Sequence, residues 1–135
     1  MGIPRGGVIV ANLVAVKLKA ANFDIVIPRK LRIPHNEEAA FGAIMDDGTV
    51  YIDDRIVRDL DISEEYIEKE KQLQMLEIKR RFALYRNKEL QQPLESKINK
   101  NAITILVDDG AASGATVIAA ARSIRKTFSL MNNNK

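Results

Sequence analysis

The apolar positions of this chain fall into runs that predict both helices and strands. Residues 8–20 are apolar nearly all round, which is the pattern of a helix that packs into a core against a sheet. Residues 23–27 and 103–107 are short runs rich in β-branched residues, typical of strands buried on both faces. The basic segment 29–32 follows the first of these runs and is expected to be a loop.

A small hairpin and a long helix are predicted in the middle of the chain. Residues 41–45 and 50–52 flank a turn sequence, Asp46-Asp47-Gly48, so they are expected to pair as antiparallel strands. From Ser63 to Arg86 the pattern predicts a helix, with Ser63 as its cap. The apolar residues of this helix recur three or four positions apart and form one packing stripe: Met75, Ile78, Phe82 and Tyr85.

The end of the chain repeats the order of a strand followed by a helix. Residues 117–128 carry apolar side chains at helical spacing, after the run at 103–107 and a loop of small residues. The polar segment 87–101 is expected to be a connection. We therefore predict one α/β domain over residues 1–135, with a mostly parallel, Rossmann-like sheet flanked by helices. The hairpin and the long helix are additions to that core.

Composition narrows the chemistry that this chain can perform. Its 135 residues include no cysteine and one histidine, which excludes disulfides, thiolate zinc sites and three-histidine zinc sites formed by this chain alone. The longest apolar run, residues 7–16, is shorter than a membrane span requires, so a cytoplasmic protein that binds no membrane is expected. The net charge of +3, from 21 basic and 18 acidic residues, is too small to indicate a nucleic-acid partner.

Two adjacent acids stand where the apolar run 103–107 ends. Asp108 and Asp109 lead into a loop of small residues before the last helix: Gly110, Ala111, Ala112, Ser113, Gly114, Ala115 and Thr116. Small residues let a phosphate approach the backbone, and the start of a helix offers free amide N–H groups. The two carboxylates can accept hydrogen bonds from neighbouring hydroxyl groups. This order of residues predicts a site for a sugar phosphate such as ribose 5-phosphate.

The segment 103–116 resembles the phosphoribosyl-diphosphate signature of the type I phosphoribosyltransferases, in which apolar residues precede two acids and a small-residue loop. The opening sequence Gly2-Ile3-Pro4-Arg5-Gly6-Gly7 is similar to the diphosphate-binding loop of that family. The sequence Arg29-Lys30-Leu31 resembles its basic segment. The family often has a non-proline cis peptide in the diphosphate loop, so an unusual backbone is expected near Pro4 and Arg5.

The resemblance implies a reaction and a role for each matching residue. A nucleophile such as a nucleobase nitrogen would displace diphosphate from C1 of phosphoribosyl diphosphate, with Mg²⁺ as cofactor. Asp108 and Asp109 would be the catalytic residues and would hold the ribose hydroxyls and Mg²⁺, directly or through water. The loop 110–116 would hold the 5-phosphate. The diphosphate would be bound by four residues: Arg5, Gly6, Gly7 and Lys30.

Two departures from the family pattern lead to further expectations. The family has a strand immediately before the diphosphate loop and more chain after the last helix, so this chain is expected to be truncated at both ends. Without the leading strand, a neighbouring strand would have an unpaired edge. Such an edge favours a homo-oligomer, for example a dimer.

Simpler interpretations apply to other residues and to the chain as a whole. Asp46-Asp47-Gly48 is expected to be an ordinary turn, and His35 a solvated turn residue instead of a catalytic base. For the function, the main alternative is a regulatory module that binds phosphoribosyl diphosphate or nucleotides, or an inactive homologue, without turnover. A weak RNA-binding protein is a third hypothesis and rests on the basic end of the long helix, residues 79–86.

Overall fold

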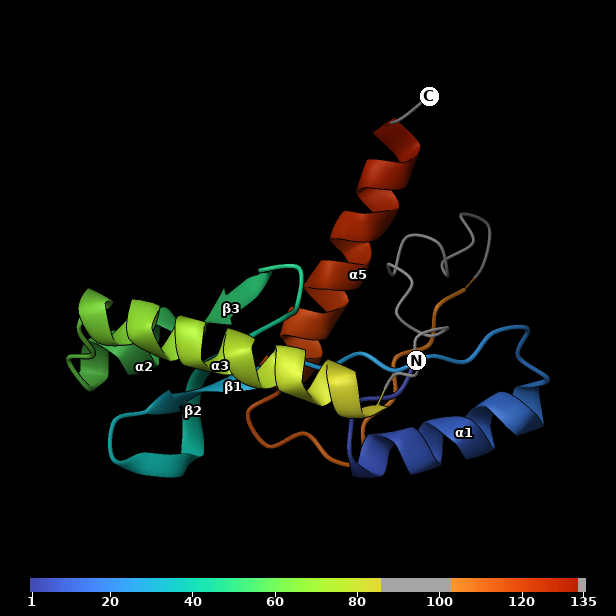
Figure 1. The fold of residues 1–135 in the computed structure, drawn as a ribbon, viewed down its shortest axis with the longest axis horizontal. Coiled ribbons are helices and arrows are strands. Elements are labelled where there is room, and N and C mark those ends of the chain that lie inside the picture. The colour runs from blue at the N-terminus through green and yellow to red at the C-terminus, as the bar shows by residue number, and fades with distance from the viewer. Residues whose placement is uncertain (86–102, 134–135) are drawn as a thin grey trace.

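The computed structural model describes residues 1–85 and 103–133 and has a mixed α/β fold (Figure 1). Its first half contains helix α1, Gly6–Leu18, followed by the strands β1, Arg29–Ile33, β2, Asn36–Ile44, and β3, Val50–Ile52. Helices α2, Asp54–Asp59, and α3, Glu64–Tyr85, come next, and α5, Ala115–Asn133, ends the described part. The predicted hairpin, long helix and final helix are confirmed, whereas α2 was not predicted.

The three strands form an antiparallel sheet in the order β1-β2-β3. Gly42 of β2 pairs with Leu31 on one side and with Ile52 on the other. The predicted turn after β2 contains Gly48, which has a φ of 77° and donates its N–H to the Met45 carbonyl at 3.1 Å. Glycine adopts a positive φ without steric cost, so this residue suits the turn.

Strand β1 corrects the prediction of a basic loop at residues 29–32. Leu31 is fully buried and Lys30 beside it is exposed, which is the alternation expected of a strand. Between β1 and β2 lies His35, an exposed residue with a φ of 62°, in a region that histidine adopts more often than most residues. His35 is therefore a turn residue, as predicted. Basic side chains do not prevent a strand when the positions between them are buried.

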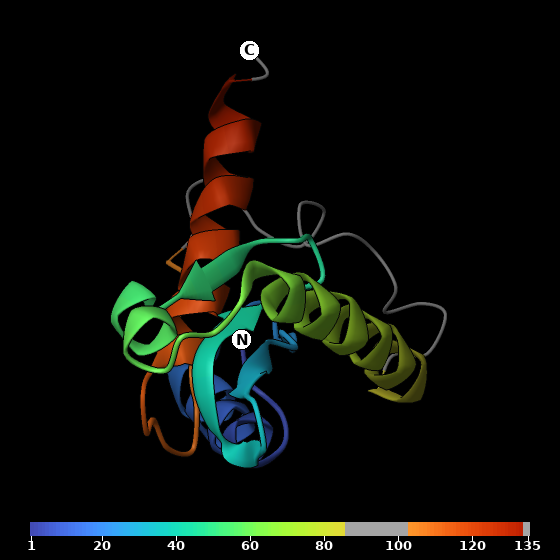
Figure 2. The same cartoon turned by 90° about the vertical axis from the view of Figure 1, so that its left-hand side faces the viewer.

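Helices α3 and α5 pack against the sheet and complete two hydrophobic cores. Figure 2 shows the two helices on different sides of the strands. Ala43 of β2 packs in the core that contains Ala119 of α5. Leu31 and Phe41 pack in the other core with Ile78 of α3, so the apolar stripe predicted for the long helix does serve packing.

Residues 1–3 pair in parallel with two segments that lie further along the chain. Gly2 forms isolated parallel bridges with Ile25 and with Val107, so residues 1–3 lie between the two runs that were predicted as strands. Gly2 N donates to Asp24 O at 2.9 Å, and Ile3 N donates to Val107 O at 3.0 Å. The expectation of an unpaired edge here is therefore wrong, because these few residues bond both neighbours. Among the described residues the assigned strands are antiparallel, and parallel pairing is limited to these bridges.

Two apolar runs are more exposed than their patterns predicted. Helix α1 forms as expected, but only Gly7 and Ala11 in it are buried, and Ile9 is 70% exposed. Residues 103–107 form no assigned strand, and Ile103 is 92% exposed. In α1 the buried positions are the smallest residues, so its large apolar side chains face outward. The run at 103–107 pairs only near Val107, where the short segment 1–3 is within reach.

The helix boundaries agree with the predicted cap. Ser63 Oγ accepts a hydrogen bond from the Tyr66 N–H at 3.2 Å and so caps α3. The connection predicted at 87–101 lies outside the described residues. None of the helices in the described ranges has both the length and the apolar character that a membrane span requires.

Candidate functional site

The residues predicted to form the site lie at one end of three parallel segments. Residues 1–3, 24–26 and 105–107 run in the same direction, as their bridges and hydrogen bonds show. Their carboxyl ends lead into the predicted diphosphate loop, the basic segment and the acidic motif. Ligands of open α/β sheets bind outside the carboxyl ends of the parallel strands. This edge is therefore the candidate functional site.

The diphosphate loop and the acidic pair touch each other through two glycines, where the start of α1 lies beside the loop that precedes α5 (Figure 1). A Cβ added at Gly6 would overlap Asp109 Oδ2 and would lie 2.5 Å from Asp109 Cγ. A Cβ added at Gly7 would lie 2.8 Å from Asp108 Cα. At Gly7 the obstacle is backbone, so only glycine fits there, whereas at Gly6 the Asp109 carboxylate would have to move. The absence of both side chains lets the loop backbone lie against the two acids.

The two carboxylates differ in exposure, and folding changes the pKa of Asp108. Asp108 is partly buried, whereas Asp109 is exposed. Asp108 Oδ1 accepts a hydrogen bond from the Asp109 N–H at 2.9 Å. Burial raises the pKa of Asp108, and the neighbouring Asp109 side chain raises it further. A bound cation or bound hydroxyl groups would relieve this repulsion, so the pair favours such ligands.

The loop of small residues ends in the first turn of α5. Gly114 has a φ of 73°, and Ser113 Oγ accepts a hydrogen bond from the Ala115 N–H at 3.4 Å. Residues 111–113 are exposed, and a Cβ added at Gly110 would meet no heavy atom within 4 Å. The amides in the first turn of a helix lack acceptors inside the helix. The loop therefore offers both room and hydrogen-bond donors to an anion such as a phosphate.

The two cations predicted to bind diphosphate lie on different elements. Arg5 is exposed and immediately precedes α1, and the Pro4–Arg5 peptide bond is cis, so the unusual backbone predicted there is confirmed. Lys30 is exposed on β1, and its Nζ donates to the Glu38 carbonyl at 3.2 Å. Within the described residues no hydrogen bond or ion pair joins Lys30 to the loop of Arg5. The structure thus brings Gly6 and Gly7 to the acids without showing Lys30 beside them.

The acidic pair suits a magnesium ion that arrives with a phosphate-bearing substrate. The described part of the chain contains no group of three or more acidic, histidine or cysteine side chains that could hold a metal. Mg²⁺ is usually bound by one or two carboxylates, while waters and substrate phosphates supply the other oxygens. Asp108 and Asp109 provide carboxylates of this kind, and their mutual repulsion favours a cation. The residues present therefore fit the group that the sequence resemblance implies.

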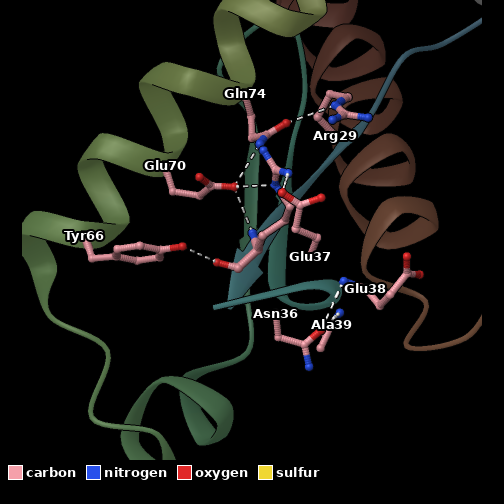
Figure 3. Close-up of polar contacts among 9 residues, drawn as sticks. Arg29, Asn36, Glu37, Glu38, Ala39, Tyr66, Glu70 and Gln74 are labelled. Atoms are coloured by element: carbon pink, nitrogen blue, oxygen red, sulfur yellow. Dashed lines mark hydrogen bonds and ion pairs between the residues drawn. The ribbon is translucent and has the colours of Figure 1, made fainter. Parts of the chain in front are cut away.

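A second polar cluster, between β1 and α3, was not predicted from the sequence (Figure 3). Glu70 and Gln74 are almost completely buried, and Gln74 Nε2 donates to Glu70 Oε1 at 2.8 Å. Arg32 donates to the same Glu70 oxygen, and Arg29 donates to Gln74. Glu70 and Gln74 precede Ile78 by eight and four residues, which places them on the buried side of α3. That spacing is the signal that could have revealed the cluster.

The chain is similar in sequence to two curated proteins and in structure to one crystal structure. Two proteins of Mycobacterium tuberculosis, from strains CDC 1551 and H37Rv and each named "Putative phosphoribosyl transferase", are 38% identical to it over 125 residues. The match covers 93% of this chain and 27% of each relative, so the chain spans about a quarter of the length of these curated relatives. The crystal structure of TT1426 from Thermus thermophilus is similar with a TM-score of 0.59 and 30% identity, over 93% of this chain and 57% of that one. No protein-family model matches the chain.

Proposed function

We propose that this chain carries the phosphoribosyl-diphosphate-binding part of a Mg²⁺-dependent phosphoribosyltransferase that acts on a nucleobase-like acceptor. The observation that carries the proposal is the contact of Gly6 with Asp109 and of Gly7 with Asp108. It joins two motifs that are far apart in the sequence and that the proposed reaction requires side by side. The names of the two Mycobacterium tuberculosis relatives support phosphoribosyl transfer as the reaction.

The acidic pair has the task of holding and activating the ribose in the proposed reaction. Asp108 and Asp109 accept hydrogen bonds from the ribose hydroxyls. Their negative charge stabilises the positive charge that develops at C1 as the bond to diphosphate breaks. A bound Mg²⁺, held by the same carboxylates directly or through water, would neutralise charge on the diphosphate.

The phosphate groups at the two ends of the substrate are held by backbone amides and by charged or hydroxyl side chains. The first turn of α5, with the hydroxyls of Ser113 and Thr116, binds the 5-phosphate. Arg5 and the amides of Gly6 and Gly7 bind the leaving diphosphate. A guanidinium suits this role because it stays charged and can donate two parallel hydrogen bonds to one phosphate. The nucleophile then approaches C1 from the side opposite the diphosphate.

The parallel segments are, in this proposal, part of the mostly parallel, Rossmann-like sheet expected from the sequence. The bridges from Gly2 to Ile25 and to Val107 support this assignment. In such a sheet, the loops that follow neighbouring strands meet at one edge. The diphosphate loop and the acidic pair would then owe their contact to the order of these segments.

Binding and turnover of phosphoribosyl diphosphate test the proposal directly. With Mg²⁺ present, we expect this ligand to raise the Tm of the chain, and we expect diphosphate release when a panel of nucleobases includes the acceptor. A higher Tm without diphosphate release for any acceptor would favour the regulatory-module hypothesis. An unchanged Tm would contradict the binding site itself.

Two acid-to-amide variants make the test specific. Asp109→Asn removes the charge beside Gly6, and it should weaken binding of phosphoribosyl diphosphate about tenfold or more, because a hydrogen bond to a charged group contributes about 1.5–3 kcal/mol. Asp59→Asn changes an exposed acid at the end of α2 and should bind the ligand as the wild type does. Equal affinities of Asp109→Asn and the wild type would contradict the role assigned to Asp109.

A further inference from the structure

A cavity between β1 and α3 is separate from the acidic pair of the candidate site. It has a volume of about 270 Å³, and its charged lining residues are Arg29, Arg32, Arg80 and one acid, Glu77. Arg80 is paired with Glu77, its Nε donating to Glu77 Oε2 at 2.7 Å. Leu73 and Leu76 of α3 give it an apolar wall. Its volume is close to the lower end of the range for small-molecule pockets, about 300–1,000 Å³. A small organic molecule with one charged group would fill it.

Arg29 is held at this cavity by a neutral partner. Its Nε donates to Gln74 Oε1 at 3.0 Å, and Figure 3 shows Gln74 between Arg29 and Glu70. Gln74 is fully buried and its Nε2 donates to Glu70, so both ends of the amide are bonded and its orientation is set. Within the described residues Arg29 forms no ion pair, and neither of its Nη groups has an acceptor. The part of this guanidinium that can bind a carboxylate or a phosphate is therefore available.

The charged groups around Arg29 leave this end of the cavity positive. Arg81 and Arg32 repel its charge, whereas Glu77 and Glu70 attract it. Both glutamates are already engaged: Glu77 accepts from Arg81 Nε at 2.8 Å, and Glu70 accepts from Arg32 Nε at 3.3 Å. Burial and Arg81 lower the pKa of Arg29, because a partly buried cation without its own carboxylate is disfavoured. An anion in the cavity would supply the missing partner.

We propose that this cavity binds a small organic anion, a carboxylate or a phosphate monoester, and that Arg29 holds the charged group. A guanidinium fixed through Nε presents its two Nη groups as a fork that matches one carboxylate or one phosphate. Leu73 and Leu76 contact the apolar remainder of the ligand. The proposal goes beyond phosphoribosyl transfer and does not depend on it. Arg29 belongs to the basic segment at the edge of the candidate site, but it lines a cavity whose residues include neither Asp108 nor Asp109.

Backbone amide shifts of the full chain locate the ligand. The probes are benzoate, phenyl phosphate and neutral benzamide, which share a ring and differ in charged group. We expect benzoate or phenyl phosphate to shift the amides of residues 29–32 and 73–77, and the stronger of the two identifies the anion class. Shifts confined to residues 5–7 and 108–116, or equal binding of benzamide and both anions, would overturn the proposal.

Arginine variants test the role of Arg29. Arg29→Gln should lose about tenfold or more of the affinity for the better anion, because it removes a charged hydrogen-bond donor. Arg58→Gln removes an exposed arginine from α2 and should bind as the wild type does. Arg29→Lys keeps the charge without the fork and should bind between these two. Wild-type affinity in Arg29→Gln overturns the proposal. If Arg29→Gln does not fold, the affinity of Arg29→Lys and the amide shifts of the wild type decide.

Discussion

At the scale of single residues, Gly6 is the position on which the candidate site depends most directly. A Cβ at this position would overlap Asp109 Oδ2, so in Gly6→Ala either the diphosphate loop or the Asp109 carboxylate must move. We expect the affinity for phosphoribosyl diphosphate to fall about tenfold or more, as for loss of a charged hydrogen bond. Helix α1 should persist, because alanine favours a helix more than glycine does. Titration calorimetry measures the affinity, and far-UV circular dichroism checks the helix.

Gly110→Ala is the matched control for the stability of this variant. A Cβ at Gly110 would meet no heavy atom within 4 Å, so the Tm should equal that of the wild type. A lower Tm in Gly6→Ala alone would show that the added methyl group strains the loop. Full affinity for phosphoribosyl diphosphate in Gly6→Ala would contradict the importance of the contact between Gly6 and Asp109.

Asp108 has an unfavourable charge that a neutral side chain would remove. Burial and Asp109 raise its pKa above the ordinary value of 3.8. An acid whose pKa is raised by folding destabilises the folded state progressively as the pH rises from the unfolded to the folded pKa, and the loss remains above both. Asp108→Asn should therefore have a higher Tm than the wild type at about pH 7, and the difference should vanish near about pH 3. Calorimetry over this pH range measures it.

The same substitution should impair the site while it stabilises the fold. We expect Asp108→Asn to bind phosphoribosyl diphosphate at least about tenfold more weakly, since the amide cannot offer a charged acceptor to the ribose hydroxyls. A Tm below that of the wild type at neutral pH would show that the charged Asp108 does not destabilise the folded state. A stable variant with weak binding would instead show that the acid is kept for its ligand.

Residues of the acidic motif could be predicted because their chemistry is local in the sequence. Asp108, Asp109 and the small-residue loop stand in one continuous order of apolar run, acids, loop and helix. The contact of Arg29 with Gln74 could not be found in this way, because the two residues are 45 positions apart in the sequence. The side chain of segment 29–31 that faces α3 is set by strand β1. The basic composition of the segment had predicted a loop there, so this orientation could not be predicted.

At the scale of elements, helices could be predicted more completely than strand pairing. The period of α3 is contained in its own residues, so its cap at Ser63 and its buried Ile78 follow from the local pattern. A strand is defined by its partner, and β1 exists because β2 pairs with it. The run at 103–107 has the composition of a strand but meets residues 1–3 only near Val107, so pairing stops there.

The buried polar cluster on α3 makes a clear prediction for stability. Glu70→Ala leaves the Arg32 guanidinium and the Gln74 amide without their shared acceptor. We expect the free energy of unfolding to fall by about 2–3 kcal/mol, the typical loss for a buried charged hydrogen-bonding group. Urea unfolding followed by circular dichroism measures the change.

Glu68→Ala is the control on the same helix. Glu68 is largely exposed, and among the described residues it pairs with Lys71 three positions along, so its loss should cost about 0.5 kcal/mol or less. Similar losses in Glu68→Ala and Glu70→Ala would contradict the structural importance of the cluster. A larger loss in Glu70→Ala would show that the hydrogen bonds of Glu70 to Arg32 and Gln74 stabilise the packing of α3 on β1.

At the scale of the whole molecule, residues 1–3 connect parts of the chain that are distant in sequence. Gly2 bridges to Ile25 and Val107, and the next residue, Ile3, is 4% exposed in the same core as Ala119 of α5. The acidic motif follows Val107 directly, and Ile3 lies in the same loop as Arg5, Gly6 and Gly7. The packing that stabilises the fold is thus the packing that holds the two loops of the candidate site together.

This coupling predicts that one buried side chain near the start of the chain affects both stability and binding. Ile3→Ala should lower the free energy of unfolding by about 2–5 kcal/mol, the usual cost of truncating a buried isoleucine, and should reduce the affinity for phosphoribosyl diphosphate. Ile9→Ala makes the same chemical change at a position that is 70% exposed on α1, so both quantities should stay close to those of the wild type. Urea unfolding measures the stability of the two variants, and titration calorimetry measures their affinity. The comparison separates the effect of burial from the effect of replacing isoleucine by alanine. A large loss in both variants would show that the exposed face of α1 is covered in solution, and a loss in neither would show that residues 1–3 do not hold the parallel segments together.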